Sequence, residues 1–461
     1  MSEQPLAVGW ISSRIGLPPK DWKITTLADI AESLVDGPFG SNLKSEHYVD
    51  EPGVRVVRLQ NIQEGEYNDR DPAFISDHHA EHLVRNTVIA GDVLVAALGD
   101  ETYPVGRACV YPSHLPPAIN KADCFRLRCN PDVALNAFVS LFLNGTAART
   151  QVKRFEQGVT RRRTNLGNLR RVLILLPSTT EQRRIAEILS TLDEAIERTE
   201  ALIGKLQQIK AGLMHDLFTR GVTPDGQLRP IREQAPYLYK QSSLGWIPNE
   251  WEVKPLTQFA ASRPGCFVNG PFGSNLLTSE LTDSGVPVIY SQDVKVDGYC
   301  RISNSHITEE KADELAICNA KDGDVLVAKV GNPPGIAAAY LAPQRGVITQ
   351  DVIRIRPADN VDAKFLACLL NSTVGIRAIQ HITIEGTRAR VSLTEFKALQ
   401  FPKPLLEEQL LISAKISGLQ QLVNACSCDC TKLKQLKQGL MRDLLTGWVR
   451  VSVTSSNLGS G

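Results

Sequence analysis

The stretch "DGPFGSN" at residues 36–42 recurs as "NGPFGSN" at residues 269–275, about 230 positions later in a chain of 461 residues. Its glycines and its proline predict a structured turn, because glycine permits positive φ and proline fixes φ. A tight turn written twice, so far apart, indicates that one chain contains the same fold twice.

The rest of the sequence supports a repeat. Four further pairs of stretches recur in the same order: "LPPKDW" (17–22) with "IPNEW" (247–251), "GDVLVA" (91–96) with its identical copy (323–328), "TTEQRRIAEIL" (179–189) with "LEEQLLISAKI" (406–416), and "GLMHDLFTRG" (212–221) with "GLMRDLLTGW" (439–448). A period this long indicates a duplicated domain rather than a solenoid. Between these matches the two halves differ strongly, so a shared frame carries individual loops.

Composition places the chain among ordinary globular proteins, with an apolar content of 43%. No apolar run is long enough to cross a membrane, and the start, "MSEQPLAVGW", has no basic segment before an apolar stretch, so we expect a cytoplasmic protein. The ten cysteines show no disulfide spacing. "CSCDC" at 426–430 lacks a matching second pair, and we interpret it as cysteines on a helix rather than a metal site.

Each half begins with a predicted mixed α/β region. The two "GDVLVA" stretches start at a Gly-Asp turn and continue as short apolar runs typical of buried strands. "CFRLRCN" (124–130) and "DVIRIRP" (351–357) alternate apolar and basic residues, which predicts a half-exposed strand. "DVALNAFVSLFLN" (132–144) and "VDAKFLACLLNST" (361–373) are predicted to be short helices.

Each half ends in a predicted long helix with a heptad stripe. Ser178 can cap the first helix and Gly221 can end it. Its apolar stripe comprises Ile185, Ile188, Leu189, Leu192, Ala195, Ile196, Leu202, Ile203, Leu206, Ile209, Leu213 and Leu217. The stripe of the second helix comprises Ile412, Ile416, Leu419, Leu422, Val423, Leu433, Leu436, Leu440 and Leu444. Asp429 stands at the place of Leu202 and is expected to weaken the second stripe locally.

A helix with such a stripe must bury it, and the economical partner is the other copy. We therefore predict an α+β protein in which two similar mixed α/β regions are joined by two long helices that form a coiled coil with pseudo-twofold symmetry. Its antiparallel direction is a hypothesis, since the pattern alone does not orient a pair. The residues expected to form the seam and to dock partners are Ile185, Leu192, Leu206, Leu213, Ile412, Leu419, Leu433 and Leu440.

The predicted boundaries follow the repeat. They are a first α/β region at 1–178, a long helix at 179–221, a linker at 222–244, a second α/β region at 245–404, a long helix at 405–447 and a tail at 448–461.

The sequence lacks the familiar catalytic motifs G-x-x-x-x-G-K-[ST], G-x-G-x-x-G and H-E-x-x-H. His78, His79 and His82 lack further ligands and are interpreted as a surface helix. "GNPPG" (331–335) is similar to the Asn-Pro-Pro-aromatic motif with which adenine methyltransferases grip a flipped base. Because Gly335 stands at the aromatic position, a turn is favoured, and a methyltransferase built on Asn332-Pro333-Pro334 stays an alternative.

Basic residues are clustered although the net charge is only +1. Residues 149–171 carry eight arginines and lysines against a single acid, and "GVTRRR" (158–163) has a counterpart in "GTRAR" (386–390). Guanidinium groups can fork to O6 and N7 of guanine or grip a phosphate, so we predict DNA contacts, with a solvated basic face as the alternative. The candidate contacts are Arg161, Arg162, Arg163, Arg388 and Arg390, with Asn120, Lys121 and Gln350 at equivalent places before a strand.

Two similar heads on a stiff spacer, with different loops in a common frame, can read two different short DNA segments. A single chain that imitates a dimer in this way does not need a palindromic target. A coiled-coil adaptor without sequence-specific DNA binding is a further alternative, which explains the helices but not the divergent loops.

The repeated Gly-Pro-Phe-Gly-Ser turn, the "GDVLVA" strand, the Glu-Gln pair that opens each long helix (181–182 and 408–409) and the closing "GLM-x-DL" together resemble the specificity subunit of type I restriction-modification enzymes. The resemblance covers both halves and nearly the whole chain. It implies two target recognition domains and conserved helices in an antiparallel coiled coil, in a non-catalytic subunit that reads a bipartite, asymmetric target in double-stranded DNA.

The resemblance also implies partners: two methyltransferase subunits that use S-adenosylmethionine, and restriction subunits that translocate and cut DNA with ATP. This chain itself is then expected to bind no cofactor and no metal, and not to be an enzyme. The family has no fixed set of base contacts, so the candidate residues named above stay inferences from this sequence.

Overall fold

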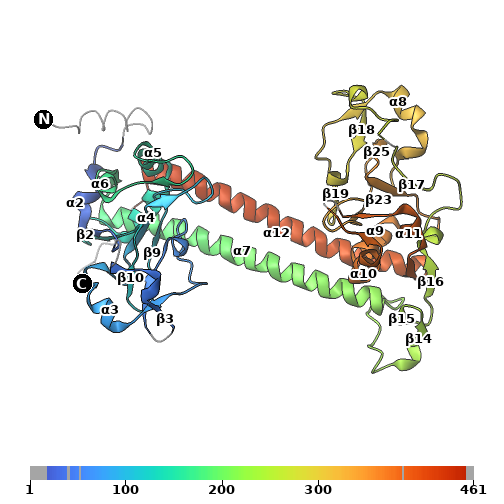
Figure 1. The fold of residues 1–461 in the computed structure, drawn as a ribbon, viewed down its shortest axis with the longest axis horizontal. Helices are drawn as coiled ribbons and strands as arrows, with labels where there is room; N and C mark the ends of the chain where they lie inside the picture. The colour runs from blue at the N-terminus through green and yellow to red at the C-terminus, as the bar shows by residue number, and fades with distance from the viewer. Residues whose placement is uncertain (1–17, 39–41, 51–52, 272, 387–388, 453–461) are drawn as a thin grey trace, which may run out of the picture. The chain divides into compact units, whose positions relative to one another are not determined.

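The structure of the protein is a computed structural model that describes residues 18–38, 42–50, 53–271, 273–386 and 389–452. The chain divides into two compact units (Figure 1). Unit 1 contains Met1–Thr199 and Asp429–Gly461, and unit 2 contains Glu200–Cys428. Each unit holds one head and a part of each long helix, and each is described by itself. No helix in the described residues is long and apolar enough to cross a membrane.

The head of unit 1 contains two main sheets. The first sheet has the strand order β2 (Ala31–Val35), β11 (Cys124–Cys129), β7 (Val93–Ala96), β9 (Ala108–Val110). The second has the order β3 (Tyr48–Val49), β5 (Phe74–Ile75), β4 (Val54–Val57), β10 (Ala118–Asn120), β6 (Thr87–Val88). All neighbours are antiparallel except β4 and β10, which are parallel. Helix α4 (Asn136–Asn144) packs on β7 and β9 and is followed by α5 (Thr146–Arg154).

The head of unit 2 repeats this architecture. Its main sheets have the orders β17 (Phe267–Asn269), β26 (Val352–Ile355), β23 (Val325–Ala328), β24 (Ala337–Ala339), and β21 (His306–Ile307), β18 (Val286–Ile289), β25 (Gly346–Ile348), β22 (Asn319–Ala320). Here β18 and β25 form the parallel pair. Helix α9 (Ala363–Asn371) packs on β23 and β24 and is followed by α10 (Thr373–His381). The internal repeat of a mixed α/β head is therefore confirmed.

Shorter elements complete each head. In both, the first strand pairs antiparallel with the strand that leads into the long helix, β1 (Lys23–Thr26) with β13 (Leu173–Leu176) and β16 (Glu252–Pro255) with β29 (Gln400–Lys403). Further short helices are α2 (Leu27–Ile30), α3 (Asp77–Glu81), α6 (Leu166–Arg170), α8 (Glu309–Glu314) and α11 (Leu393–Ala398). Further strand pairs include β14 (Tyr239–Ser242) with β15 (Gly245–Pro248) and β19 (Val294–Lys295) with β20 (Gly298–Tyr299). The three histidines lie on or directly after the exposed helix α3.

The prediction of a half-exposed strand with outward arginines is wrong. Both β11 and β26 lie in the interior, and their central arginines, Arg126 and Arg354, are only 4% and 1% exposed. Both faces of these strands are covered by the rest of the head, so Arg126 and Arg354 are enclosed as fully as the apolar residues beside them. Their basic side chains lie within the fold, where backbone carbonyls such as those of Arg85 and Ile317 accept hydrogen bonds from them.

An ion pair between a buried aspartate and a partly exposed arginine accompanies these strands in each head. Arg128 donates two hydrogen bonds of 2.8 Å to the carboxylate of Asp92, and Arg356 donates bonds of 2.9 and 2.8 Å to Asp324. The two aspartates are those of the repeated "GDVLVA" stretches, and both are nearly fully buried. Bidentate pairing with arginine satisfies a carboxylate that would otherwise be costly to bury.

The repeated glycine turns press against the backbone of the strand that follows the divergent loops. A Cβ atom at Gly37 would lie 1.9 Å from the carbonyl oxygen of Lys121, and one at Gly270 would lie 2.2 Å from the carbonyl oxygen of Thr349. Only glycine permits this approach, so both turns belong to the shared frame of the heads.

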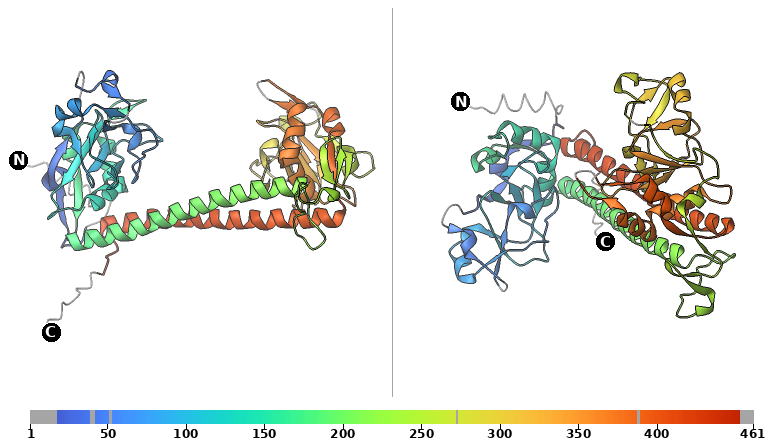
Figure 2. Two further views of the ribbon diagram at one scale, coloured as in Figure 1. Left: turned by 90° about the horizontal axis from the view of Figure 1, so that it is seen from below. Right: turned by 45° about the vertical axis from the view of Figure 1, so that its right-hand side comes forward.

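The long helices are α7 (Thr179–Thr219) and α12 (Leu406–Thr446), which lie side by side in each unit (Figures 1 and 2). In unit 1, Ile185 and Leu189 near the start of α7 share a buried cluster with Leu444 near the end of α12. In unit 2, Leu217 near the end of α7 shares a cluster with Ile412 near the start of α12. Within each unit the two helices therefore run antiparallel.

Polar contacts between the helices keep the same register. Lys437 contacts Asp193 in unit 1, and Lys210 contacts Gln420 in unit 2. Of the predicted seam residues, Ile185, Leu206 and Ile412 are buried, whereas Leu192, Leu213, Leu419, Leu433 and Leu440 are half-buried.

Part of the predicted stripe lies outside the seam. Leu202, Ile209, Leu422 and Leu436 are each about half exposed, because they stand one position before a seam residue in each heptad. Asp429 occupies the same outer position, so it does not weaken the seam as predicted.

A buried glutamate anchors the start of each long helix. In unit 2, Glu408 accepts hydrogen bonds from Trp251 Nε1 (2.9 Å), the backbone N–H of Val222 (2.8 Å) and the guanidinium of Arg229. In unit 1, Glu181 accepts bonds from Trp22 Nε1 (3.2 Å) and from Arg450, at 2.7 Å to Nε. Each tryptophan belongs to the first segment of its head, and each arginine belongs to the segment that follows the other long helix.

The glutamine after each glutamate ties the helix to the loop before the first core helix of the head. Gln182 accepts from the backbone N–H of Leu135 (2.8 Å), and Gln409 accepts from that of Asp362 (3.1 Å). Both glutamine side chains are fully buried. The repeated Glu-Gln pair is therefore the joint between head and helix.

The two arginines of these joints predict an asymmetry in stability. We expect Arg229→Ala to lower the free energy of unfolding by about 3–5 kcal/mol, because its 7% exposed side chain leaves a buried carboxylate unpaired. We expect Arg450→Ala to cost less, about 1–3 kcal/mol, because it also leaves a buried carboxylate, that of Glu181, but from a side that is 42% exposed and open to water. Urea unfolding of the two variants measures the difference, and equal losses would contradict the account of the joints.

Candidate nucleic-acid interface

The basic cluster of unit 1 contains a short hairpin at residues 157–163, which is closed by a bridge between Gln157 and Arg163. Strand β12 (Arg162–Arg163) pairs antiparallel with β8 (Leu98–Gly99), which directly follows the "GDVLVA" strand. The hairpin turns at Gly158, whose φ of +98° favours glycine and whose Cβ would lie 2.5 Å from the carbonyl oxygen of Arg161. The side chain of Val159 at this turn is 93% exposed.

The predicted arginines of this hairpin already have acidic neighbours. Arg162 lies 3.6 Å from Glu101 and 3.7 Å from Glu156, and Arg163 lies 3.0 Å from Asp123. These acids are distant in sequence from the basic cluster, except Glu156, so the pattern of basic residues alone did not indicate them. Each ion pair is partly exposed to solvent, and a phosphate or a base edge could replace the carboxylate.

Arg161 is exposed and lines a cavity of about 460 Å³ beside the loop that follows β8. Arg107, which the sequence analysis did not single out, closes one side of this cavity and is 5% exposed. Its guanidinium donates to the backbone carbonyls of Ile62 (2.7 Å), Leu59 (3.0 Å) and Leu98 (3.0 Å). Arg107 therefore holds two surface loops together and lends no charge to a ligand directly.

The head of unit 2 brings equivalent segments together. Strand β28 (Arg390–Val391) pairs with β27 (Thr383–Ile384), and Arg390 also bridges to Val330, which follows the second "GDVLVA" strand. The N–H of Gly331 donates to the carbonyl of Ala389 at 3.1 Å. Arg390 is exposed, and the predicted contact Arg388 lies outside the described residues.

The remaining candidate contacts have different environments. Gln350 is exposed, and Lys121 is half-buried with its Nζ donating to the hydroxyl of Tyr48 at 2.8 Å. The expectation that Asn120 is available for a DNA contact is wrong, because its side chain is 0% exposed and Asn86 donates to its Oδ1 at 3.3 Å. A side chain enclosed in this way supports the frame and does not reach a base.

One carboxyl near the arginine hairpin has a perturbed pKa. Burial raises the pKa of Asp36 to about 6, an effect reinforced by the charge of Asp123 and opposed by the Gly37 N–H and by Arg163. Asp36 opens the repeated glycine turn of unit 1. The charge beside Arg163 therefore depends on pH in the slightly acidic range.

Comparison with known proteins adds to this geometry. The family model for the type I restriction modification DNA specificity domain matches residues 19–208 and 248–438. The putative type I restriction enzyme MjaX specificity subunit of Methanocaldococcus jannaschii is 23% identical, over 95% of this chain and 96% of that protein. The StySPI specificity subunit of Salmonella potsdam is 20% identical, over 94% and 90% of the two chains.

Solved structures share the fold. A chain from a study of complex assembly and conformational transition in the type I R-M system has a TM-score of 0.56 and 17% identity, over 94% of this chain and 99% of that chain. The crystal structure of the type I restriction-modification S subunit from M. genitalium has a TM-score of 0.54 and 15% identity, over 92% and 96%.

The raised pKa of Asp36 makes stability depend on pH with a defined sign. The folded state holds this proton more tightly than the unfolded chain, whose ordinary value is 3.8, so the free energy of unfolding falls as pH rises from about 4 to about 6. Asp36→Asn removes this contribution. We expect the variant to become more stable than the wild type above pH 6 and to match it near pH 4, in urea unfolding at a series of pH values. A stability difference that stays constant from pH 4 to 7 would contradict the perturbed pKa.

Proposed function

The chain belongs to the type I restriction-modification DNA specificity family, and we propose that each of its two heads reads one half of a bipartite, asymmetric DNA target. The observation that carries this proposal is a juxtaposition found in both heads. In each, an arginine-bearing hairpin lies against the loop that follows the "GDVLVA" strand. The backbone arrangement is shared, whereas the loops read Asp-Glu-Thr-Tyr at 100–103 and Asn-Pro-Pro at 332–334.

The chemistry of the unit 1 hairpin suits guanine and phosphate. Arginine is the side chain that forks to O6 and N7 of guanine in the major groove, and it also grips phosphates. The acids that pair with Arg162 and Arg163 lower the attraction of this surface for DNA of arbitrary sequence. Separating these ion pairs costs free energy, and only a DNA sequence that the arginines fit well offsets this cost. The hairpin therefore favours selectivity for particular sequences over affinity for DNA in general.

The long helices act as the spacer between the two readings. We infer that α7 and α12 form one antiparallel coiled coil, of roughly 60 Å at about 1.5 Å per residue. The antiparallel contacts within each unit support this inference. A spacer of fixed length sets the number of unread base pairs between two half-sites, as in twofold DNA-binding proteins.

Chemistry on the DNA is assigned to partners. The chain serves as a non-catalytic subunit, and methyltransferase subunits with S-adenosylmethionine and restriction subunits with ATP dock on it. On the helices of unit 2, three half-exposed side chains lie outside the seam: Leu202, Ile209 and Leu422. This outward row offers the partner subunits an apolar surface. Among the relatives named above, both curated proteins are specificity subunits of type I restriction enzymes.

The alternative of a methyltransferase built on Asn332 has a steric obstacle. Gly335, which stands where that motif has an aromatic residue, has φ of +91°, and a Cβ there would lie 2.8 Å from Ile379. No side chain that could stack on a flipped base fits at this position.

The arginine hairpin provides a test of half-site reading. Replacing Arg161, Arg162 and Arg163 with alanine should weaken recognition of one half-site, because each lost bidentate base contact costs about 1–3 kcal/mol. The measurement is binding to a DNA library in which the two half-sites are randomised separately, in the presence of the methyltransferase subunits. Combined replacement of Arg183, Arg184 and Arg198, exposed arginines on α7, with alanine serves as a control of equal charge. An equal loss on unrelated DNA would instead make the hairpin a phosphate contact.

The outward row provides a test of partner docking. Ile209→Ser with Leu422→Ser should leave the urea midpoint nearly unchanged, since both side chains are about half exposed, and should reduce methyltransferase binding at least tenfold. Complex formation is measured by light scattering on a sizing column. The matched control is Gln208→Ser with Cys428→Ser, which changes exposed positions on other sides of the same helices. An intact complex would exclude this row as the docking surface.

A further inference from the structure

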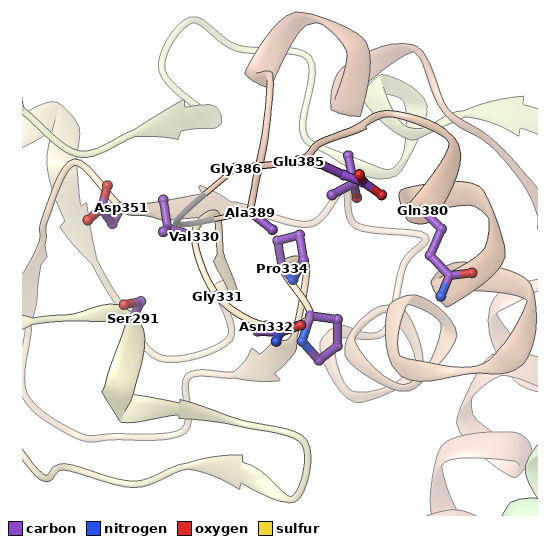
Figure 3. Close-up of a pocket in the computed structure, with 12 residues that line it drawn as sticks. Ser291, Val330, Gly331, Asn332, Pro334, Asp351, Gln380, Glu385, Gly386 and Ala389 are labelled. Atoms are coloured by element: carbon purple, nitrogen blue, oxygen red, sulfur yellow. The ribbon is translucent and has the colours of Figure 1, made fainter.

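The Asn-Pro-Pro stretch lies in a large open cavity in the head of unit 2. The cavity has a volume of about 980 Å³ and includes Asn332, Ser291, Asp351, Gln380 and Glu385 among its lining residues. Figure 3 shows the 331–334 loop near the centre, with Ser291 and Asp351 on one side of it and Gln380 and Glu385 on the other. Residues 331–334 therefore lie in the middle of a cavity that is lined on both sides by polar side chains.

The polar side chains of this cavity are available to a ligand. Within the described part of the chain, those of Ser291, Asn332, Asp351, Gln380 and Glu385 make no hydrogen bond or ion pair with another residue. Among the described residues that line the cavity there is no lysine and no arginine, and Arg388 falls in the undescribed stretch between the lining residues Gly386 and Ala389. The charged groups among these described residues are the carboxylates of Asp351 and Glu385, so these residues offer hydrogen-bond acceptors and amides, unlike the arginines of the unit 1 hairpin.

The backbone holds Asn332 in place. On one side of it the N–H of Gly331 donates to Ala389 (3.1 Å), and on the other the N–H of Gly335 donates to Ala328 (2.7 Å). Pro334 is buried, whereas Asn332 is exposed. A short loop anchored at both ends fixes the backbone from which this amide projects, so binding has to order the side chain of Asn332 but not the loop.

An asparagine amide in this setting matches one base. Its oxygen accepts from the N6 amino group of adenine while its nitrogen donates to N7, both on the major-groove edge. The neighbouring carboxylates can accept from the N6 amino group of adenine, whereas they repel the O6 acceptor that guanine presents at the same place. The surroundings and the amide thus select the same kind of base edge.

We propose that Asn332 is a specificity-determining residue that reads an adenine in the half-site bound by the head of unit 2. This inference rests on the proposed function, since it assumes that the head enters the major groove of DNA. It gives the unit 2 head a preference for a base with an exposed amino group, whereas the unit 1 hairpin, with Arg161 beside its cavity, is suited to guanine. The Asn-Pro-Pro stretch then recognises a base in the duplex and needs no flipped base.

The test uses the full chain with its methyltransferase subunits and a DNA library randomised at both half-sites. The wild type should enrich a bipartite motif, and failure to do so would refute the proposed function itself. With Asn332→Ala, the preference for adenine at one position of one half-site should fall by about 5- to 150-fold, while the other half-site keeps its sequence. With Asn332→Asp, which removes the donor, the same position should shift towards cytosine, because a carboxylate accepts from the N4 amino group.

The controls separate this contact from a general effect. Asn304→Ala changes an exposed asparagine of the same head outside the cavity and should leave both half-sites unchanged. If the wild type enriches a bipartite motif but Asn332→Ala keeps it unaltered, the proposal is overturned while the proposed function stands. A change at a base other than adenine, or a uniform loss on both half-sites, overturns it equally.

Discussion

The carboxylate at the start of each long helix joins three distant segments of the chain. Glu408 lies on α12 and binds Trp251 in the first segment of its head and Arg229 in the segment after α7. Glu181 makes the equivalent joint in unit 1. A buried charge is tolerated only when it is paired and hydrogen-bonded, so each glutamate holds its partners in place. Head, helix and returning chain are thereby fixed to one another, and the geometry of each unit follows from this joint.

Within the heads, a second set of paired charges keeps the frame constant while the loops vary. The ion pairs of Asp92 with Arg128 and of Asp324 with Arg356 lock the central strands. The surface loops grow from the ends of these strands and contribute little to the core. Selection can therefore change the loops without unfolding the head, which is the property that the proposed reading of two different half-sites requires.

Much of this architecture could be predicted because it depends on periodic patterns and on a long repeat. The heptad stripes located both helices, but Leu202 and Leu422 look identical to seam residues until the register of the pair is known. The strand arginines were misplaced because alternation cannot distinguish solvent from buried backbone carbonyls as the partners of a guanidinium. Arg229 and Arg450 were missed for a different reason. They serve equivalent joints from positions that the repeat does not align, so no pattern links them. In the candidate interface, the hairpin could be located from sequence, whereas the acids Glu101 and Asp123 and the exclusion of Asn120 required coordinates.

The division of the chain between the units has a consequence for synthesis on the ribosome. Unit 2 is one continuous stretch, Glu200–Cys428, whereas unit 1 is made of two stretches that enclose it. The second head, although encoded later, has all its residues available before the first head can receive Arg450 or the end of α12. Domains usually fold in the order in which they are translated. Here unit 2 can complete its fold first, and unit 1 stays incomplete until the residues after Cys428 have left the ribosome.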